Sequence, residues 1–89
     1  MRIDKFLKVS RIIKRRTVAK EVAGAGRIQV NGNAAKAGTE VIPGDEIAIR
    51  FGKKTLTVRV ESTASAAHKD QAAHMYTTLN EQYHDDNNN

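Results

Sequence analysis

The sequence contains no cysteine, which excludes disulfide frameworks, thiolate metal sites and cysteine nucleophiles. It has no tryptophan and only two phenylalanines and two tyrosines, so an RRM-like aromatic platform that stacks several bases is not expected. No apolar run approaches the roughly 18 residues of a membrane span, and the basic N-terminus lacks the continuous apolar segment of a secretory signal. We therefore expect a cytoplasmic protein that does not contact a membrane.

Positive charge is concentrated near the N-terminus, where eight cations and one acid, Asp4, lie between Arg2 and Lys20. The cations are Arg2, Lys5, Lys8, Arg11, Lys14, Arg15, Arg16 and Lys20. Apolar residues are woven through the same stretch, among them Ile3, Phe6 and Leu7, and a disordered basic arm would have no use for them. The pattern predicts a folded helical unit with one buried face and one cationic face, which in a small protein favours nucleic acid as the partner.

Two helices are expected in the basic region. Ile3, Phe6 and Leu7 recur at helical spacing and define the first. Thr17 is the expected N-cap of the second, whose apolar stripe runs through residues 18, 19, 22 and 23. Gly24 or Gly26 is expected to end it, because glycine accepts the left-handed conformation at a helix terminus.

Short strands are expected after the second helix, because the period of the apolar residues changes from 3.6 to 2. The pair Asn31-Gly32 predicts a hairpin with a type I′ turn, and a further turn is expected at residues 43–45. Alternation continues through residues 47–51 and 56–60. The expected fold is α+β, with two N-terminal helices packed on a small antiparallel sheet of three to five strands.

The C-terminal third differs in composition, since residues 61–89 carry a net charge of −4 against +9 for residues 1–60. Residues 62–83 are expected to form a helical extension, with Ala72, Ala73, Met75, Tyr76 and Leu79 on one side. That side either covers the core or presents a protein-binding surface. Residues 84–89 are expected to be a disordered acidic tail.

Four segments resemble, in order, the motifs of the S4 RNA-binding domain. They are RIDKFL at 2–7, RTVAK at 16–20, GRIQVNG at 26–32, and Lys36 with PGDEI at 43–47. The runs RIDKFLKVSRIIKRRTVAKEVA and AAHMYTTL are similar to the RqcP (YabO) group of S4 proteins, and more distantly to the fifteen-kilodalton heat-shock protein. The resemblance implies an S4 (alpha-L) fold over residues 1–61. It also implies binding to large-subunit rRNA and peptidyl-tRNA on stalled, split ribosomes, in support of alanine tailing by an RqcH-type factor.

The expected RNA contacts follow from the chemistry of the cations. The guanidinium fork suits phosphate, so Arg11, Arg15 and Arg16 are expected to contact the RNA backbone directly. On the sequence alone, Arg16→Ala is expected to weaken binding without moving the thermal midpoint. The remaining candidates are Arg2, Lys5, Lys8, Lys14, Thr17, Lys20, Asn31 and Lys36. The roles of two residues stay open. Arg2 contacts RNA, or it pairs with Asp4 or the sheet. Asp4 is either structural, capping the first helix or orienting a neighbouring arginine, or a functional acid that positions Arg16 or a ribose hydroxyl.

Catalysis is not expected. The three histidines, His68, His74 and His84, lie in the acidic part, with neither a nucleophile nor a third metal ligand beside them. We expect a monomer without cofactor. Two other binding functions remain open: an S4-type ribosome-assembly or translation-regulatory protein, and a helix-turn-helix DNA-binding regulator.

Overall fold

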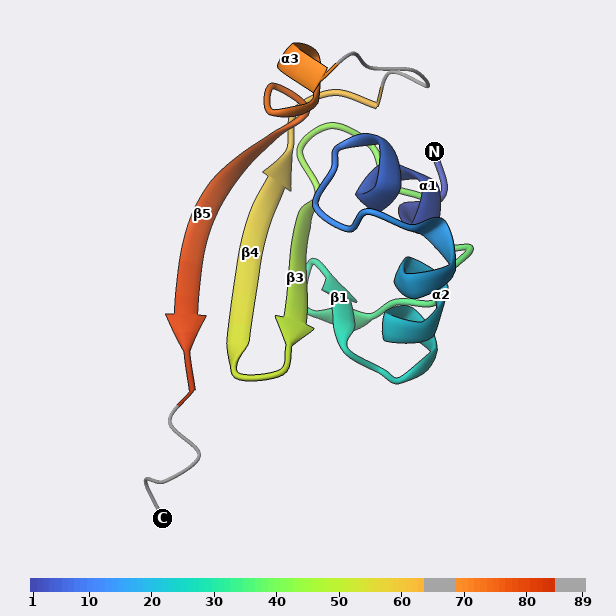
Figure 1. Cartoon of the computed structure of the whole chain (residues 1–89), viewed down its shortest axis with the longest axis vertical. Coiled ribbons are helices and arrows are strands. Elements are labelled where there is room, and N and C mark those ends of the chain that lie inside the picture. Colours follow the sequence, from blue (N-terminus) through green and yellow to red (C-terminus); the bar gives the residue numbers. More distant parts are fainter. Residues whose placement is uncertain (64–68, 85–89) are drawn as a thin grey trace.

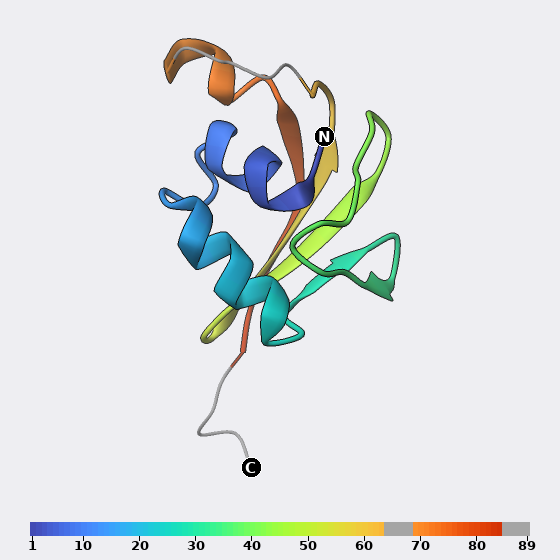
Figure 2. The ribbon, with the colours of Figure 1, turned by 90° about the vertical axis from the view of Figure 1, so that its right-hand side faces the viewer.

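The computed structural model describes residues 1–63 and 69–84, which form two helices on one side of an antiparallel sheet (Figures 1 and 2). The helices are α1 (Ile3–Val9) and α2 (Arg16–Gly24), and a short helix α3 (Lys69–Ala72) follows later. The strands are β1 (Ile28–Val30), β2 (Asn33–Ala34), β3 (Glu46–Phe51), β4 (Lys54–Val60) and β5 (Tyr76–Tyr83). Their spatial order is β2-β1-β3-β4-β5, with every neighbouring pair antiparallel. The predicted α+β class, with two helices on a small antiparallel sheet, is confirmed.

The core lies between the helices and the covered face of the sheet. Ile3, Phe6 and Leu7 of α1 are fully buried, as the helical spacing predicts. From the sheet, alternate residues of β3 and β4 point toward the helices, including Ile47, Ile49, Leu56, Val58 and Val60. Burying one such side chain stabilises the fold by about 1.5–3 kcal/mol. This packing fixes the two helices, and with them the N-terminal cations, on the sheet.

The first turn of α1 is satisfied by a loop and by Asp4. The backbone N–H of Ile3 donates to the Thr39 carbonyl at 2.7 Å, and that of Asp4 to the Ala37 carbonyl at 3.3 Å. The N–H of Lys5 donates to Asp4 Oδ1 at 2.8 Å. Asp4 therefore bonds one amide of the first turn from inside the helix, whereas the N-cap residue is Arg2. The loop ties the start of α1 to the body of the domain.

The prediction that Thr17 caps α2 is wrong. Arg15 occupies the N-cap in an extended conformation without a side-chain cap, and Thr17 lies inside the first turn. At the other end, Gly26 with φ +76° follows the helix, and its N–H donates to the Ala23 carbonyl at 3.0 Å. The next N–H, from Arg27, donates to the Val22 carbonyl at 3.2 Å. These two bonds form a Schellman motif, so Gly26 is the glycine that terminates the helix.

The predicted type I′ hairpin is present between β1 and β2. Asn31 and Gly32 have φ values of +52° and +85°, and Val30 pairs with Asn33. The side chain of Asn31 also ties the turn to the start of β3. Its Nδ2 donates to Asp45 Oδ1 at 3.1 Å, and its Oδ1 accepts the Glu46 N–H at 3.0 Å.

Asn31→Ala is therefore expected to destabilise the protein by about 1–2 kcal/mol, because it removes both bonds and places alanine at positive φ. In a domain of this size, each kcal/mol lowers the thermal midpoint by about 4–8 °C. Thermal unfolding followed by circular dichroism measures the shift. An unchanged midpoint would show that the side chain does not hold the turn.

The predicted C-terminal helix over residues 62–83 is wrong. The helix α3 is one turn long, and Tyr76–Tyr83 forms the strand β5, which pairs along β4 with a bulge at Thr57/Val58. Without β5, β4 would expose an unpaired edge, and the β-branched and aromatic residues of the segment suit a strand. Ala72 and Met75 are buried, so this part of the chain does cover the core.

The predicted boundary at residue 84 also fails. The N–H of His84 donates to the Lys53 carbonyl at 2.6 Å, and its Nε2 lies 2.7 Å from Thr55 Oγ1. Residues 85–89 of the expected tail lie outside the described residues. Among those described, no helix is long and apolar enough to cross a membrane.

Candidate nucleic-acid interface

A buried carboxylate holds two arginines at the start of the helical pair. Asp4 has no exposed surface. Arg16 approaches it side-on, with Nε 3.2 Å from Oδ2 and Nη2 3.2 Å from Oδ1. Arg2 places Nη2 3.2 Å from the same Oδ2. With the Lys5 N–H on Oδ1, the carboxylate accepts three hydrogen bonds, and the contact of Arg16 Nε with Oδ2 is an ion pair. The cluster of Arg2, Asp4 and Arg16 is thus a fully bonded unit with one net positive charge.

The environment of Asp4 keeps it ionised. Burial alone would raise the pKa of Asp4, but the hydrogen bond from Arg16, the Lys5 N–H and the two positive charges lower it below 3.8. The guanidinium groups remain accessible, since 49% of the Arg2 side chain and 42% of the Arg16 side chain are exposed. Their remaining N–H groups can donate to a phosphate while two contacts with Asp4 fix the plane of the Arg16 fork and one contact anchors Arg2.

Unpaired cations surround this cluster. Five are exposed and form no ion pair within the described residues: Lys8, Arg11, Lys14, Arg15 and Lys20. They lie on α1, on the turn between the helices and on α2. Two basic residues of β4 are instead paired: Arg59 Nε lies 3.0 Å from Glu61 Oε2, and Lys54 Nζ lies 3.7 Å from Glu81 Oε1. The helical pair therefore carries a group of five cations that lack a charged partner.

The first turn of α2 adds backbone donors. The N–H groups of Arg16, Thr17 and Val18 have no acceptor in residues 1–63 and 69–84, and the Thr17 side chain is exposed beside them. Unsatisfied amides at a helix N-terminus favour an anion.

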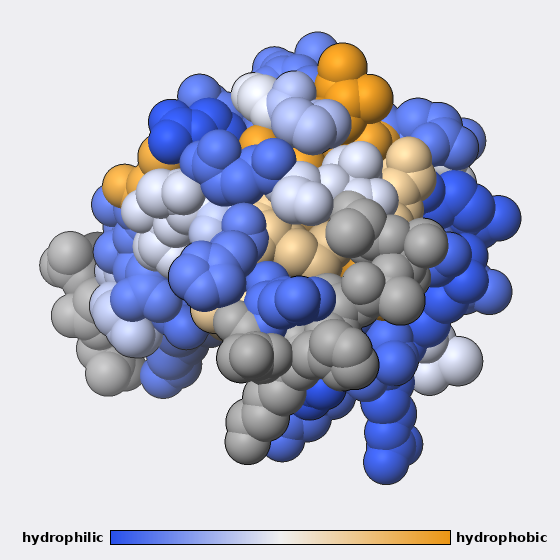
Figure 3. Space-filling view, turned by 90° about the horizontal axis from the view of Figure 1, so that it is seen from above, coloured by the Kyte–Doolittle hydropathy of each residue, from blue (hydrophilic) through white to orange (hydrophobic). Residues whose placement is uncertain are grey.

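Figure 3 looks onto the end of the molecule that carries α3, and hydrophilic side chains surround the hydrophobic areas exposed there.

Comparison with known proteins shows the family to which this chain belongs. Residues 1–47 match the model of the S4 domain family. Curated relatives from Bacillus subtilis and Listeria innocua are 60% and 59% identical, and the alignments cover 92% and 97% of this chain and 95% and 94% of the relatives. Both are named RQC P-site tRNA stabilizing factor. The chain belongs to this S4 domain family of factors. The resemblance to S4 proteins of ribosome quality control is thereby confirmed.

Solved structures agree with the S4 assignment. Heat Shock Protein 15 of Vibrio cholerae, described as trimeric, superposes with a TM-score of 0.81 at 28% identity, covering 89% of this chain and 81% of its own. The solution structure of hypothetical protein HP1423 gives a TM-score of 0.77 at 27% identity, covering 92% of this chain and all of its own. The S4 core of this chain is thus shared with both.

The S4 motif residues divide into two sets. The helical pair brings together Arg2, Asp4 and Arg16, and carries the other cations of the basic stretch. Asn31 lies on the β1–β2 turn, where both polar atoms of its side chain are bonded within the protein. Lys36 is exposed in the loop that supports the start of α1. Of the roles left open for Asp4, the structure shows the contacts that orient Arg16. For Arg2 it shows the pairing with Asp4.

This geometry changes the expectation for Arg16. Arg16→Ala removes both Arg16 contacts to a buried carboxylate, so we now expect a stability loss of about 1–3 kcal/mol together with weaker RNA binding. Arg16→Lys keeps the charge but loses the fork. It is expected to bind RNA more weakly than wild type with a smaller shift of the thermal midpoint. Parallel melting and filter-binding measurements on both variants test this; equal binding by Arg16→Lys and wild type would exclude a role for the fork.

Arg11 occupies a strained position in the S4 domain. It follows the C-cap of α1 with φ +65°, and its N–H donates to the Lys8 carbonyl at 3.0 Å. Glycine is the residue that normally adopts this conformation.

Arg11→Gly is therefore expected to stabilise the fold by about 0.5–1 kcal/mol. If the guanidinium contacts a phosphate, the same change weakens RNA binding by about fivefold at physiological salt. Thermal unfolding and RNA titration on one preparation give both numbers. A variant that is more stable and binds as well as wild type would remove Arg11 from the interface.

Proposed function

We propose that this chain binds the large ribosomal subunit and the P-site tRNA of stalled, split ribosomes, and so supports alanine tailing of the nascent chain by an RqcH-type factor. It contacts rRNA and peptidyl-tRNA through the helical pair, acts as a monomer in the cytoplasm, and catalyses no reaction itself. The name carried by the curated relatives supports the tRNA partner. The observation that carries the proposal is the Asp4-held pair of guanidinium groups beside the unpaired cations.

The mechanism is electrostatic positioning. A tRNA that has lost the small subunit and its codon is held by fewer contacts. A rigid cationic domain that lies between two phosphate backbones restores some of these contacts. Arg2 and Arg16 are oriented in advance by Asp4, so little conformational freedom is lost when they bind. With about six phosphates engaged, the log–log slope of affinity against salt would be roughly −4 to −5.

Sucrose-gradient co-sedimentation tests the proposal. Tagged protein is mixed with large subunits that carry a P-site peptidyl-tRNA, with empty large subunits, and with small subunits, each at two salt concentrations. We expect co-migration with large subunits, strongest when tRNA is present and reduced at the higher salt. Loss of alanine tails on stalled chains in a depleted extract, restored by wild type, completes the test.

The outcomes separate the alternatives. Equal binding to empty and tRNA-carrying large subunits, without an effect on tailing, would favour the ribosome-assembly or regulatory S4 protein. Protein that stays at the top of the gradient but binds duplex DNA would favour the DNA regulator. The short α2 argues against the latter, because Ala19 and Ala23 are buried and leave few polar side chains for reading bases.

A further inference from the structure

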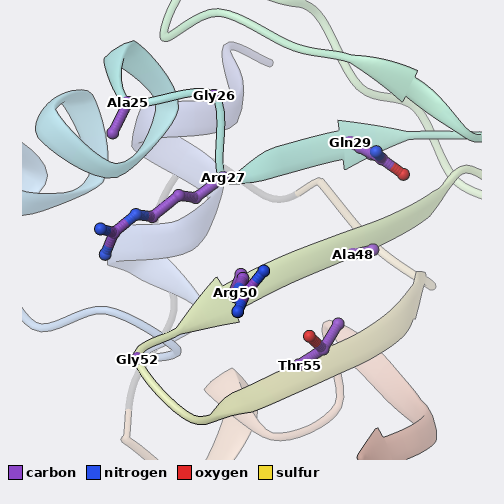
Figure 4. Close-up of a pocket in the computed structure, with 8 residues that line it drawn as sticks. All are labelled: Ala25, Gly26, Arg27, Gln29, Ala48, Arg50, Gly52 and Thr55. Atoms are coloured by element: carbon purple, nitrogen blue, oxygen red, sulfur yellow. The ribbon is translucent and has the colours of Figure 1, made fainter. Parts of the chain in front are cut away.

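The helices cover one face of the sheet, and the opposite face contains a hollow of about 520 Å³. Side chains from three adjacent strands and two turns line it (Figure 4). Its polar members are Arg27, Gln29, Arg50 and Thr55, and the others are alanines and glycines. Arg50 lies near the C-terminal end of β3, and Arg27 extends from the turn that leads from α2 into β1. The size falls within the roughly 300–1,000 Å³ of typical ligand sites.

Two arginines occupy opposite positions on neighbouring strands. Ile28 pairs with Ile49 in the β1–β3 register, and the N–H of Arg50 donates to the Arg27 carbonyl at 2.9 Å. Arg27 and Arg50 are therefore opposite residues, and both emerge on the face away from the buried isoleucines. Like charges placed opposite one another destabilise a sheet. The arrangement is unfavourable unless an anion lies between or beside them.

The surroundings do not neutralise this charge. No acidic residue lines the hollow, and neither arginine forms an ion pair within the part of the chain that the structure describes. Arg59 on the same face is the contrast, since Glu46 opposes it across the strands and Glu61 lies 3.0 Å away. The sheet thus neutralises one arginine and leaves two adjacent ones without counter-charge.

The small side chain at the floor of the hollow leaves the guanidinium groups accessible to a ligand. Ala48 lies between Gln29 and Thr57 in the register, and its small side chain leaves the space above the floor open. Gln29 is exposed and contributes amide donors. The Thr55 hydroxyl is already engaged with His84, so the two arginines and Gln29 provide the free donors.

We propose that this hollow is a second phosphodiester-binding site, which takes backbone phosphates of an RNA strand between Arg27 and Arg50. The inference rests on the proposed function and extends it: the protein contacts nucleic acid on two opposite faces, the helical pair and the open face of the sheet. A protein that grips RNA on both sides can bridge two separate RNA segments. Phosphate matches two adjacent guanidinium forks better than any single acidic side chain.

The test compares two variants with matched controls. Arg27→Gln/Arg50→Gln removes both charges, and Arg27→Lys/Arg50→Lys retains them. Arg59→Gln removes a neutralised charge from the same face. Binding to large subunits carrying P-site tRNA, and to unfractionated tRNA, is measured from 50 to 200 mM salt. We expect the glutamine double variant to bind about ten- to thirtyfold more weakly, with the salt slope smaller in magnitude by about 1.5–2. The lysine double variant is expected to lose less, and Arg59→Gln less than twofold.

The thermal midpoint distinguishes binding from folding. It is expected to stay or rise in the glutamine double variant, because a like-charge contact is relieved. If that variant unfolds, Ala48→Glu provides the test, since a carboxylate in the hollow should pair with Arg50 and repel RNA. If these variants bind RNA with the affinity of wild type, the second site is excluded, whereas the proposed function is not affected. Binding to polyglutamate is measured in parallel. A loss of affinity for polyglutamate without a loss for RNA would also overturn the inference, because it would indicate an acidic protein partner. Failure of wild type to bind large subunits at all would overturn the proposed function instead.

Discussion

A chain in which Asn replaces Asp4 is expected to unfold at a lower temperature and to bind RNA more weakly, although its net charge is one unit more positive. The carboxylate is fully buried and accepts three hydrogen bonds, two of them from the guanidinium groups of Arg2 and Arg16, and Arg16 Nε lies a further 3.2 Å from Oδ2 as an ion pair. An amide keeps one oxygen acceptor and turns an NH₂ group toward those donors. The loss is expected to be about 1–3 kcal/mol, measured by thermal or urea unfolding.

The stability of wild type should also depend on pH through Asp4. Its pKa in the folded state is lowered, so its contribution to stability is complete above the unfolded value of about 3.9 and is lost as the pH falls through the lower folded value. The free energy of unfolding should therefore fall more steeply below pH 4 in wild type than in Asp4→Asn. Glu61→Gln is the control, since Glu61 is exposed and its pKa is lowered by Thr77 and Arg59 on the sheet.

RNA binding by Asp4→Asn separates two explanations of the interface. If affinity depended only on total charge, the variant would bind more tightly than wild type, as would Glu61→Gln. If affinity depends on oriented guanidinium groups, Asp4→Asn binds about tenfold more weakly while Glu61→Gln binds at least as well as wild type. Tighter binding by both variants would show that Asp4 has only a structural role.

Local signals in the sequence predicted much of this fold, because the elements concerned are determined by near neighbours. The spacing of Ile3, Phe6 and Leu7, the Asn31-Gly32 turn and the alternation in β3 and β4 each depend on a few adjacent residues. The sequence does not predict the strand β5, because this strand is stabilised by its pairing with β4. That pairing is a tertiary contact and leaves no local signal in the sequence. Apolar residues at positions 72, 75, 76 and 79 happen to fit a helical period as well.

The candidate site was predictable to a similar extent. The charge pattern alone predicts the cations of residues 2–20, and an orienting role for Asp4 is one of several possibilities that the sequence leaves open. The distances that settle the choice join residues twelve positions apart. Arg27 and Arg50 are not among the RNA contacts expected from the sequence, because their opposite positions depend on the pairing of β1 with β3. The Asn31-Gly32 turn specifies the register between β1 and β2, but it does not specify the pairing of β1 with β3.

The second large effect is expected from removing two unpaired cations, Arg15 and Lys20. Arg15→Gln/Lys20→Gln should bind large subunits carrying P-site tRNA about 25- to 50-fold more weakly at 150 mM salt, because each lost phosphate contact is worth about fivefold or slightly more. The salt slope should become smaller in magnitude by about 1.5–2. Neither side chain has a partner within the described residues, so the thermal midpoint should hardly change.

Lys54→Gln/Arg59→Gln is the matched control, with the same change in net charge. Both of these cations already have a carboxylate partner, Glu81 and Glu61 respectively, so neither offers a full charge to RNA. This control should bind within about threefold of wild type, because surface pairs of this kind contribute little and long-range charge is screened within about 8 Å at physiological salt. Equal losses in the two double variants would mean that net charge drives binding. A loss confined to Arg15 and Lys20 would instead locate the RNA on the helical pair, where Asp4 orients the arginines.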